Sequence, residues 1–299
     1  MAAGTFADAG SASARGSRYL SHMRTDTQRY GTIIIVGGGC YGSYYVRQLR
    51  RASSAGALAC ERILVVDRDP ACRVAVTPAD RADGDALPHP EVVAREWQAF
   101  FRDYFALAMR QGAAAARDAI VPSPLMPHLM FEWLVERARE RWPARSIETR
   151  ALARAPSIPW QHPAPDGTHY VSFAEWTCPI NCIEPALCPV IRGPRTWTMP
   201  AAVRAYAAAE RARGHDLAGP VVFHCRHRAY GVGMFDTRDV LAADRLVAEA
   251  GANAPVDVLV GTVSHCHGAL SILAVGAPVG DAGAACETEL LSSTRSGTV

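Results

Sequence analysis

Three cysteines occur close together in the segment from Trp176 to Trp197, which is rich in proline. Cys178, Cys182 and Cys188 follow the spacing C-x3-C-x5-C, and two of them stand directly before a proline. The segment has too little apolar sequence to order itself. A bound metal supplies such order, because ligand bonds replace the missing burial. We therefore expect the three thiols to ligate one metal centre; ordinary reduced thiols and a redox disulfide are the alternatives.

Two further clusters, His224 to His227 and Ser264 to Gly268, combine cysteine with histidine. Each follows a predicted strand, and the carboxyl ends of strands in an α/β sheet meet at one crevice. A tetrahedral metal site needs a fourth ligand. We expect Cys225 or Cys266 to be that ligand. The histidines alternatively form a separate catalytic zinc site or act as general acid–base groups, since imidazole titrates near neutral pH.

Three histidines are candidate catalytic residues, and each follows a predicted strand: His128, His227 and His265. His128 ends a proline-rich loop, 122–128, just before a predicted helix, where a substrate or a nicotinamide group could lie. The alternative for His128 is a hydrogen bond to the backbone at the start of the helix.

The spacing does not decide between zinc and an iron–sulfur cluster. Structural zinc sites usually consist of two paired C-x2–4-C motifs, and only the first pair here fits. The Cys-Pro pairs are typical of iron–sulfur loops and favour a cluster slightly. In the same segment Arg192 and Arg195 could bind a substrate carboxylate or phosphate, or simply be solvated.

A glycine-rich turn lies between an apolar run, 32–36, and a predicted helix. Its glycines have the spacing Gly-x-Gly-x-x-Gly: Gly37 permits the tight turn, Gly39 lets a pyrophosphate approach the backbone, and Gly42 lets the helix pack close to the strand. A second apolar run, 63–66, ends at Asp67, whose carboxylate suits a ribose diol. Asp67 lies a few residues beyond the usual spacing of about 20.

This Gly-rich turn and the run Val65-Val66-Asp67-Arg68-Asp69-Pro70 resemble the Rossmann-fold NAD(P)-binding superfamily, including the nucleotide-binding domains of potassium-uptake regulators. The resemblance covers residues 31 to 75 and extends in part to 118–135. It implies a dinucleotide cofactor, NAD with NADP as the alternative, held by Gly37, Gly39, Gly42 and Asp67. The cysteine segment and the second half of the chain lie outside the resemblance.

All 31 basic residues of the 299-residue chain are arginine. The absence of lysine excludes a P-loop lysine, a Schiff base and the Tyr-x-x-x-Lys pair of short-chain dehydrogenases. It also argues against the adenylating enzymes that begin with a similar glycine-rich turn. The formal charge of +2 gives no reason to expect a nucleic-acid partner.

No apolar stretch reaches the roughly 18–20 residues that span a bilayer, so we expect no membrane partner. Residues 1–30 lack an apolar core of the kind that secretory signals carry, and are predicted to be a disordered leader. We expect a cytoplasmic protein whose nine cysteines are reduced thiols or metal ligands.

Apolar periodicity predicts strands and helices in alternation. Helices are expected at 91–111, 127–141, 200–213 and 236–250, and strands at 118–122, 169–173, 220–225 and 256–262. The fold class is therefore α/β: a Rossmann-like, mostly parallel sheet, a Cys/Pro-rich irregular insertion, and a further strand–helix–strand part. The second part either extends the first sheet or forms a smaller domain.

The predicted organisation is a leader (1–30), a dinucleotide-binding domain (31–145), a metal-site loop region (146–198), a C-terminal α/β part (199–280) and a disordered tail (281–299). The predicted function is that of an NAD(P)-binding oxidoreductase that couples the dinucleotide to a Cys-ligated metal or iron–sulfur site. Its partner would be an unidentified small substrate or redox protein. The alternative is a non-catalytic nucleotide-binding sensor or redox partner with a structural zinc clip.

Overall fold

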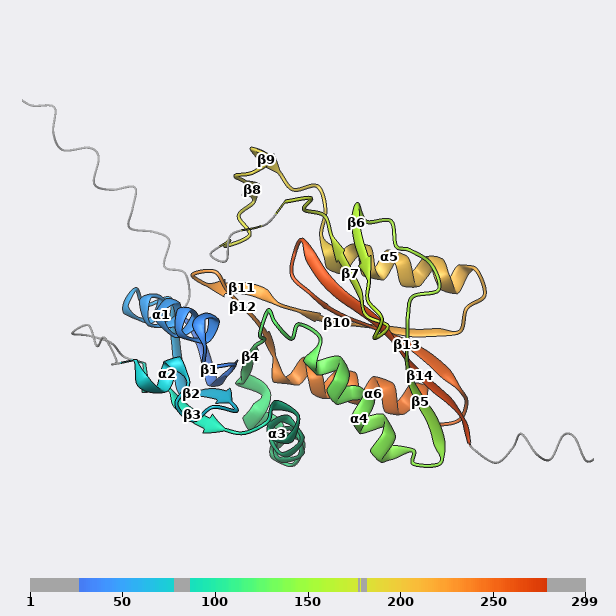
Figure 1. Ribbon diagram of the computed structural model, residues 1–299, viewed down its shortest axis with the longest axis horizontal. Coiled ribbons are helices and arrows are strands. Elements are labelled where there is room, and N and C mark those ends of the chain that lie inside the picture. Colours follow the sequence, from blue (N-terminus) through green and yellow to red (C-terminus); the bar gives the residue numbers. More distant parts are fainter. Residues whose placement is uncertain (1–26, 78–86, 177, 179–181, 279–299) are drawn as a thin grey trace, which may run out of the picture.

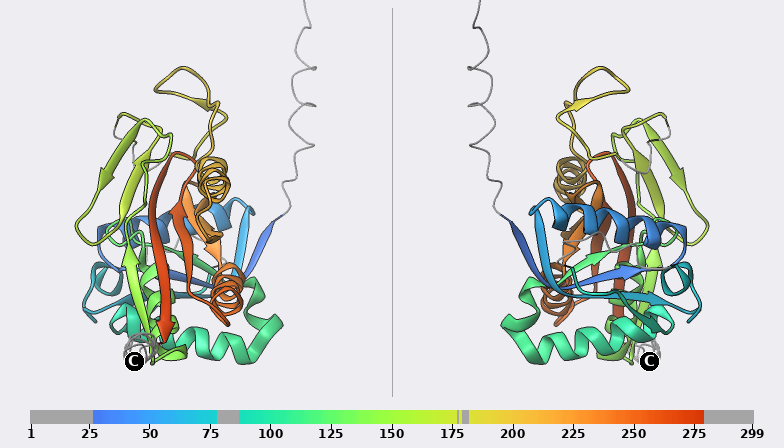
Figure 2. Two further views of the ribbon diagram at one scale, coloured as in Figure 1. Left: turned by 90° about the vertical axis from the view of Figure 1, so that its right-hand side faces the viewer. Right: turned by 90° about the vertical axis from the view of Figure 1, so that its left-hand side faces the viewer.

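The computed structural model describes residues 27–77, 87–176, 178 and 182–278, and it has two six-stranded sheets with helices on both sides of each (Figures 1 and 2). The predicted α/β class is confirmed. The predicted tail, 281–299, and residues 1–26 of the predicted leader lie outside the described residues. The first strand begins at Gln28, which is earlier than the expected start of the first domain at residue 31.

The first sheet contains four parallel strands and a hairpin. Its spatial order is β11 (Arg226–Ala229), β12 (Val232–Asp236), β4 (Ala119–Val121), β1 (Gln28–Val36), β2 (Leu58–Asp67) and β3 (Glu91–Ala94). The strands β4, β1, β2 and β3 are parallel, whereas β12 pairs with β4 antiparallel. The hairpin β11–β12 thus comes from the C-terminal half of the chain and extends the sheet formed by the N-terminal half.

The second sheet is mainly antiparallel. Its spatial order is β10 (Leu217–His224), β13 (Val256–Val263), β14 (His267–Pro278), β7 (His169–Ser172) and β6 (Trp160–Pro163), and β5 (Arg145–Arg150) also pairs with β14. Only β10 and β13 are parallel, and they are joined through the hairpin and α6 (Thr237–Ala250). This is the predicted strand–helix–strand part. A separate two-stranded ribbon, β8 (Leu187–Cys188) with β9 (Gly193–Pro194), stands away from both sheets at the top of Figure 1.

The alternation of side chains along the strands creates successive layers. Ile33, Ile35 and Val65 face α1 (Cys40–Ser54), whereas Ile34, Leu64 and Val66 face the opposite way. On that opposite side lie α3 (Trp97–Gln111), α4 (Leu129–Arg141) and α6, which also contact the inner face of the second sheet. The outer face of the second sheet is covered by α5 (Met199–Ala212). The order of layers is therefore helix, sheet, helices, sheet, helix.

Four sequence expectations are corrected by the structure. The predicted helix 91–111 begins only at Trp97, because residues 91–94 pair with β2 as an edge strand. The region 142–175, expected to hold one strand, holds β5, β6 and β7. The hairpin β11–β12 and the long strand β14 were not expected. A four-residue α2 (Arg73–Val76) and the 3₁₀ turn η1 (Gly112–Arg117) complete the described elements.

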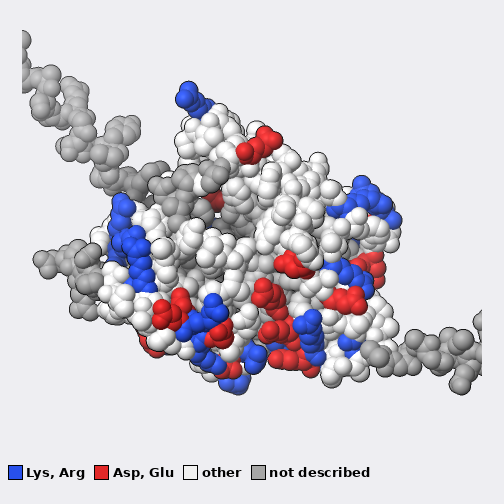
Figure 3. Space-filling view, in the orientation of Figure 1, with Lys and Arg blue, Asp and Glu red and all other residues white. Residues whose placement is uncertain are grey.

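Within the described residues, no helix is both long and apolar enough to cross a membrane. On the face shown in Figure 3, acidic and basic side chains are intermixed over the lower half. That face therefore carries no extended field of one sign in its lower half.

Asp118, which directly precedes β4, joins three elements: strand β1 and helices α3 and α6. It is buried, and its Oδ1 accepts a hydrogen bond of 2.7 Å from the Thr32 backbone N–H. Its Oδ2 accepts one of 2.7 Å from the Tyr104 hydroxyl on α3, and its carbonyl accepts one of 3.0 Å from Thr237 N–H at the start of α6. Gly31 leaves room for this carboxylate, because a Cβ there would lie 2.5 Å from Oδ1.

We predict that Asp118→Ala lowers the free energy of unfolding by about 3 kcal/mol, because two partly buried donors, the Thr32 N–H and the Tyr104 hydroxyl, lose their acceptor. Chemical denaturation measures this change. The matched control is Asp103→Ala on α3, where an exposed pair with Arg95 is lost; it should cost no more than about 1 kcal/mol. Equal effects of the two substitutions would contradict the role assigned to Asp118.

Candidate functional site

The glycine-rich turn has the geometry that each glycine was expected to permit. Gly37 has a φ of +88°, and its N–H donates to the Val66 carbonyl at 2.8 Å. A Cβ on Gly42 would lie 2.0 Å from the Gly37 carbonyl oxygen, so helix α1 can begin here only with a glycine. A Cβ on Gly39 would meet no atom within 4 Å. The backbone at Gly39 is therefore open to an approaching group.

Asp67 holds the glycine-rich turn in place. Its Oδ2 accepts a hydrogen bond of 2.6 Å from Gly38 N–H, and its Oδ1 accepts one of 3.0 Å from Asp69 N–H. Gly38 also packs against Cys72, whose sulfur would lie 2.2 Å from a Cβ at position 38. The sequence assigned Asp67 to a ribose and gave no role to Gly38. The structure gives both a part in the conformation of the turn.

A pocket of about 580 Å³ lies between the first turns of α1, the loop after β4 and the cysteine segment. Tyr41 and Tyr45 of α1 line it on one side, and prolines and Ser123 of the loop after β4 also line it. We call it the thiol pocket, because its lining includes Cys178, Cys182, Cys225 and Cys266, together with Glu184, His227 and His267. The ends of the parallel strands β10 and β13 also border it. The two clusters that follow these strands therefore meet at one crevice.

Four of the five predicted metal ligands line this pocket, and Cys188 does not. Cys188 is buried in β8, and backbone hydrogen bonds, with the nearby Arg195 as a lesser cause, lower the pKa of its thiol. Among the residues that the structure describes, no three His, Cys, Asp or Glu side chains are placed to hold one metal ion. As arranged, the thiols thus share a pocket without forming a coordination site, and metal binding stays a prediction.

The three candidate catalytic histidines occupy different environments. His227 lines the thiol pocket, and its Nδ1 is buried without a hydrogen-bond partner. His128 is buried at the start of α4 with Nδ1 3.2 Å from Thr262 Oγ1, and burial lowers its pKa to about 3. His265 is not among the lining residues, and its backbone N–H donates to Glu184 Oε1 at 2.7 Å. Of the three, only His227 is placed to reach a molecule in the pocket.

Glu184 ties the cysteine segment to the turn between β13 and β14. Besides the bond from His265, its carbonyl accepts a hydrogen bond from the Arg195 guanidinium. The Arg195 guanidinium thus donates a hydrogen bond within the cysteine segment itself. The backbone of Glu184 has a φ of +50°, which is uncommon for a side chain of this size.

Three polar side chains at the pocket form two successive contacts that the sequence did not predict. Cys178 Sγ lies 3.4 Å from His267 Nε2, and His267 Nδ1 lies 2.9 Å from Ser172 Oγ. The sequence pointed to the His-Cys-His cluster that contains His267 but did not place His267 among the candidate catalytic residues. It gave no signal for Ser172, whose partner is set by strand pairing.

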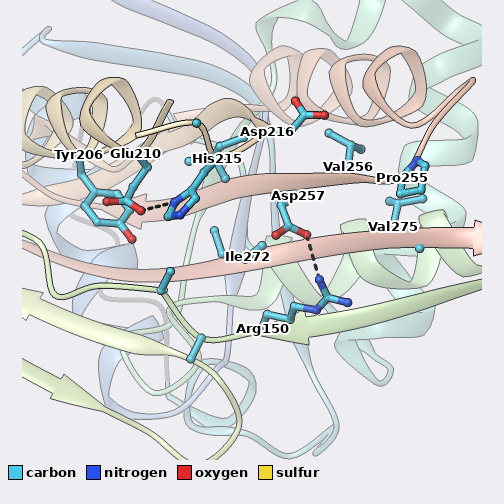
Figure 4. A pocket seen from close by; sticks show the side chains of 15 residues that line it. Arg150, Tyr206, Glu210, His215, Asp216, Pro255, Val256, Asp257, Ile272 and Val275 are labelled. Carbon is cyan, nitrogen blue, oxygen red and sulfur yellow. Dashed lines mark hydrogen bonds and ion pairs between the residues drawn. The ribbon is translucent and has the colours of Figure 1, made fainter. Parts of the chain in front are cut away.

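A second pocket, of about 620 Å³, lies at the opposite end of the second sheet, where β10 and β13 begin (Figure 4). Two pairs form among its charged and titratable side chains: His215 Nδ1 lies 2.5 Å from Glu210 Oε2, and Arg150 Nη1 lies 3.4 Å from Asp257 Oδ1. Because ligands of α/β sheets bind at the carboxyl ends of the strands, the thiol pocket is the stronger candidate site.

Comparison with known proteins finds one family similar to part of the chain. Residues 130–276, from the first turn of α4 to β14, match a family described as the C-terminal domain of an uncharacterized protein. This stretch is slightly less than half of the chain, and it contains the second sheet and the hairpin β11–β12. Neither a curated protein nor a solved structure matches the chain.

The second and third glycines of the Gly-x-Gly-x-x-Gly motif should respond differently to alanine. Gly42→Ala should lower the melting temperature by several degrees or prevent folding, because its Cβ would overlap the Gly37 carbonyl. Gly39→Ala meets open space and should cost no more than about 1 kcal/mol. Thermal unfolding followed by circular dichroism checks this, and a destabilised Gly39→Ala with a stable Gly42→Ala would contradict the geometry.

Proposed function

We propose that this protein binds a dinucleotide, NAD(H) in preference to NADP(H), and acts as an oxidoreductase on a small molecule in the thiol pocket. One observation carries the proposal: a single pocket is lined both by Tyr41, from the first turn after the glycine-rich loop, and by the Cys and His side chains. A molecule in this pocket would lie beside the predicted dinucleotide site and in contact with groups that can react.

The topology of the first sheet supports a dinucleotide. Its order β3-β2-β1-β4, with all four strands parallel, is the order of the first four strands of a doubly wound dinucleotide-binding sheet. In such sheets the ligand lies outside the carboxyl ends of the strands, where the strand order reverses. Here that position is between β1 and β4, and Pro122, which follows β4, lines the thiol pocket.

The residues around the glycine-rich turn fit a dinucleotide. Gly39 leaves its backbone open, and the amides of residues 40–42 have no acceptor within helix α1, as is general for a first helical turn. Such amides suit a pyrophosphate. Each oxygen of Asp67 accepts one hydrogen bond and can accept another from a ribose hydroxyl. A 2′-phosphate would be repelled by this carboxylate, which favours NAD.

The bound dinucleotide would supply hydride transfer. The protein's contribution would be to position the substrate and to move protons in the pocket. Of its lining residues, His227 and His267 carry imidazoles that can accept and donate protons, and Tyr41 and Tyr45 provide aromatic surface from α1.

Isothermal titration calorimetry tests the dinucleotide site. The wild-type protein should bind NADH more tightly than NADPH, and Gly39→Val should weaken NADH binding at least about a hundredfold, a loss of roughly 3 kcal/mol, because the branched side chain blocks the approach to the backbone.

The matched control is Gly193→Val in the β8–β9 ribbon, a second glycine where no atom comes closer than 3.7 Å to an added Cβ. It should leave the affinity unchanged. No heat of binding with either nucleotide would overturn the proposal. Tighter binding of NADPH would overturn only the role of Asp67 and would indicate the neighbouring Arg68.

A further inference from the structure

The pairing of β7 with β14 places Ser172 directly opposite His267. Residues paired across antiparallel strands project their side chains to the same face. The resulting contact joins Ser172 Oγ and His267 Nδ1 at 2.9 Å, and the other ring nitrogen, Nε2, lies 3.4 Å from Cys178 Sγ. Both His267 and Cys178 line the thiol pocket. A thiol, an imidazole and a hydroxyl thus form one chain that ends at the pocket.

The hydrogen bonds of Ser172 fix the tautomer of His267. The hydroxyl of Ser172 donates its single proton to the Ala174 carbonyl at 2.7 Å, and its oxygen accepts from Ala174 N–H at 2.9 Å. It can therefore only accept a hydrogen bond from His267, so Nδ1 must carry the ring proton. The lone pair of Nε2 consequently faces Cys178 and can receive the proton of its thiol.

The geometry places the thiol beside its proton acceptor. Cys178 is partly buried, and its sulfur lies within hydrogen-bond distance of Nε2, the ring nitrogen that carries no proton. A protonated thiol becomes a nucleophile only when a base accepts its proton.

We propose that Cys178 is a nucleophile, that His267 is its general base, and that the electrophile is the carbonyl carbon of an aldehyde. The choice of an aldehyde rests on the proposed function, because the carbon of an aldehyde adduct keeps a hydrogen that a dinucleotide can accept as hydride. The adduct of a ketone has no such hydrogen. Ser172 is a positioning residue that acts through His267.

The addition step is balanced without any further reactant. The S–H proton of Cys178 passes to His267 Nε2, and the sulfur forms a bond to the aldehyde carbon. The π bond of the carbonyl breaks, its electron pair becomes an alkoxide on oxygen, and the alkoxide takes the proton back from Nε2. The product is a hemithioacetal, and the step is reversible.

Alkylation by iodoacetamide, with each cysteine-containing peptide quantified by mass spectrometry, tests the proposal in the full-length protein. At pH 7 Cys178 should react at least about tenfold faster than Cys182 in the same pocket, since a positioned base typically contributes about a hundredfold or more. Propanal should slow the alkylation of Cys178 and leave the exposed Cys40 unaffected. Equal rates for the two pocket thiols, or no protection by propanal, would overturn the proposal.

Variants distinguish a chemical role from a structural one. His267→Ala should slow alkylation of Cys178 at least about tenfold, and added imidazole should restore the rate. Ser172→Ala should slow it as well, whereas Ser172→Thr, which keeps the hydroxyl, should retain it. Loss of rate without rescue by imidazole in a His267→Ala protein with a normal melting curve would overturn the role of His267.

Two further outcomes separate this proposal from others. If EDTA accelerates the alkylation of Cys178, Cys182 and Cys266 together, the thiols are metal ligands and the proposal fails. Alkylation requires no dinucleotide. A selectively reactive, propanal-protected Cys178 in a protein that binds no NADH would therefore support the thiol site and overturn only the dinucleotide proposal.

Discussion

The burial of one helical layer between two sheets is the constraint on which the rest of the structure depends. Helix α4 lies in this layer and packs against α3, α6 and strands β5, β13 and β14 of the second sheet. Where α4 meets α6, Arg141 donates to both carboxylate oxygens of Asp244 at 2.8 and 2.9 Å. This packing and the end of β4 together position the loop that precedes α4. That loop is a wall of the thiol pocket.

The segments that form the pocket are held in place by different kinds of contact. The glycine-rich turn and the start of α1 are determined locally, by close backbone contacts that only glycine permits. The cysteine segment is held instead by single polar contacts, such as the bond from His265 N–H to Glu184. The glycine-rich turn and the cysteine segment therefore lie on different sides of the pocket and are held in different ways. The Cys and His side chains between them are positioned by the second sheet and can still be reached by a ligand.

The sequence predicted well the elements whose signal is local, and poorly those that depend on pairing. The strand before Gly37, the strand before Pro122 and helix α4 stand out by apolar runs and flanking turns. Residues 91–94 continue the apolar spacing of the helix that follows, so only their pairing with β2 identifies a strand. The β11–β12 turn uses Tyr230 and Gly231, both with positive φ, without the Asn-Gly pair that usually signals it. Ser172 and His267 meet through a register that no local pattern contains.

The hairpin β11–β12 has a consequence for how the chain acquires its structure during synthesis. Domains generally fold as the N-terminal part leaves the ribosome, but here the outer edge of β4 is covered by residues 232–236. Until those residues emerge, the nascent first sheet exposes unpaired backbone groups along β4, and Asp118 lacks its contact with Thr237. Exposed edges of this kind invite pairing with other chains. The N-terminal half alone would therefore leave an open sheet edge, and the first sheet is complete only when translation has passed the hairpin.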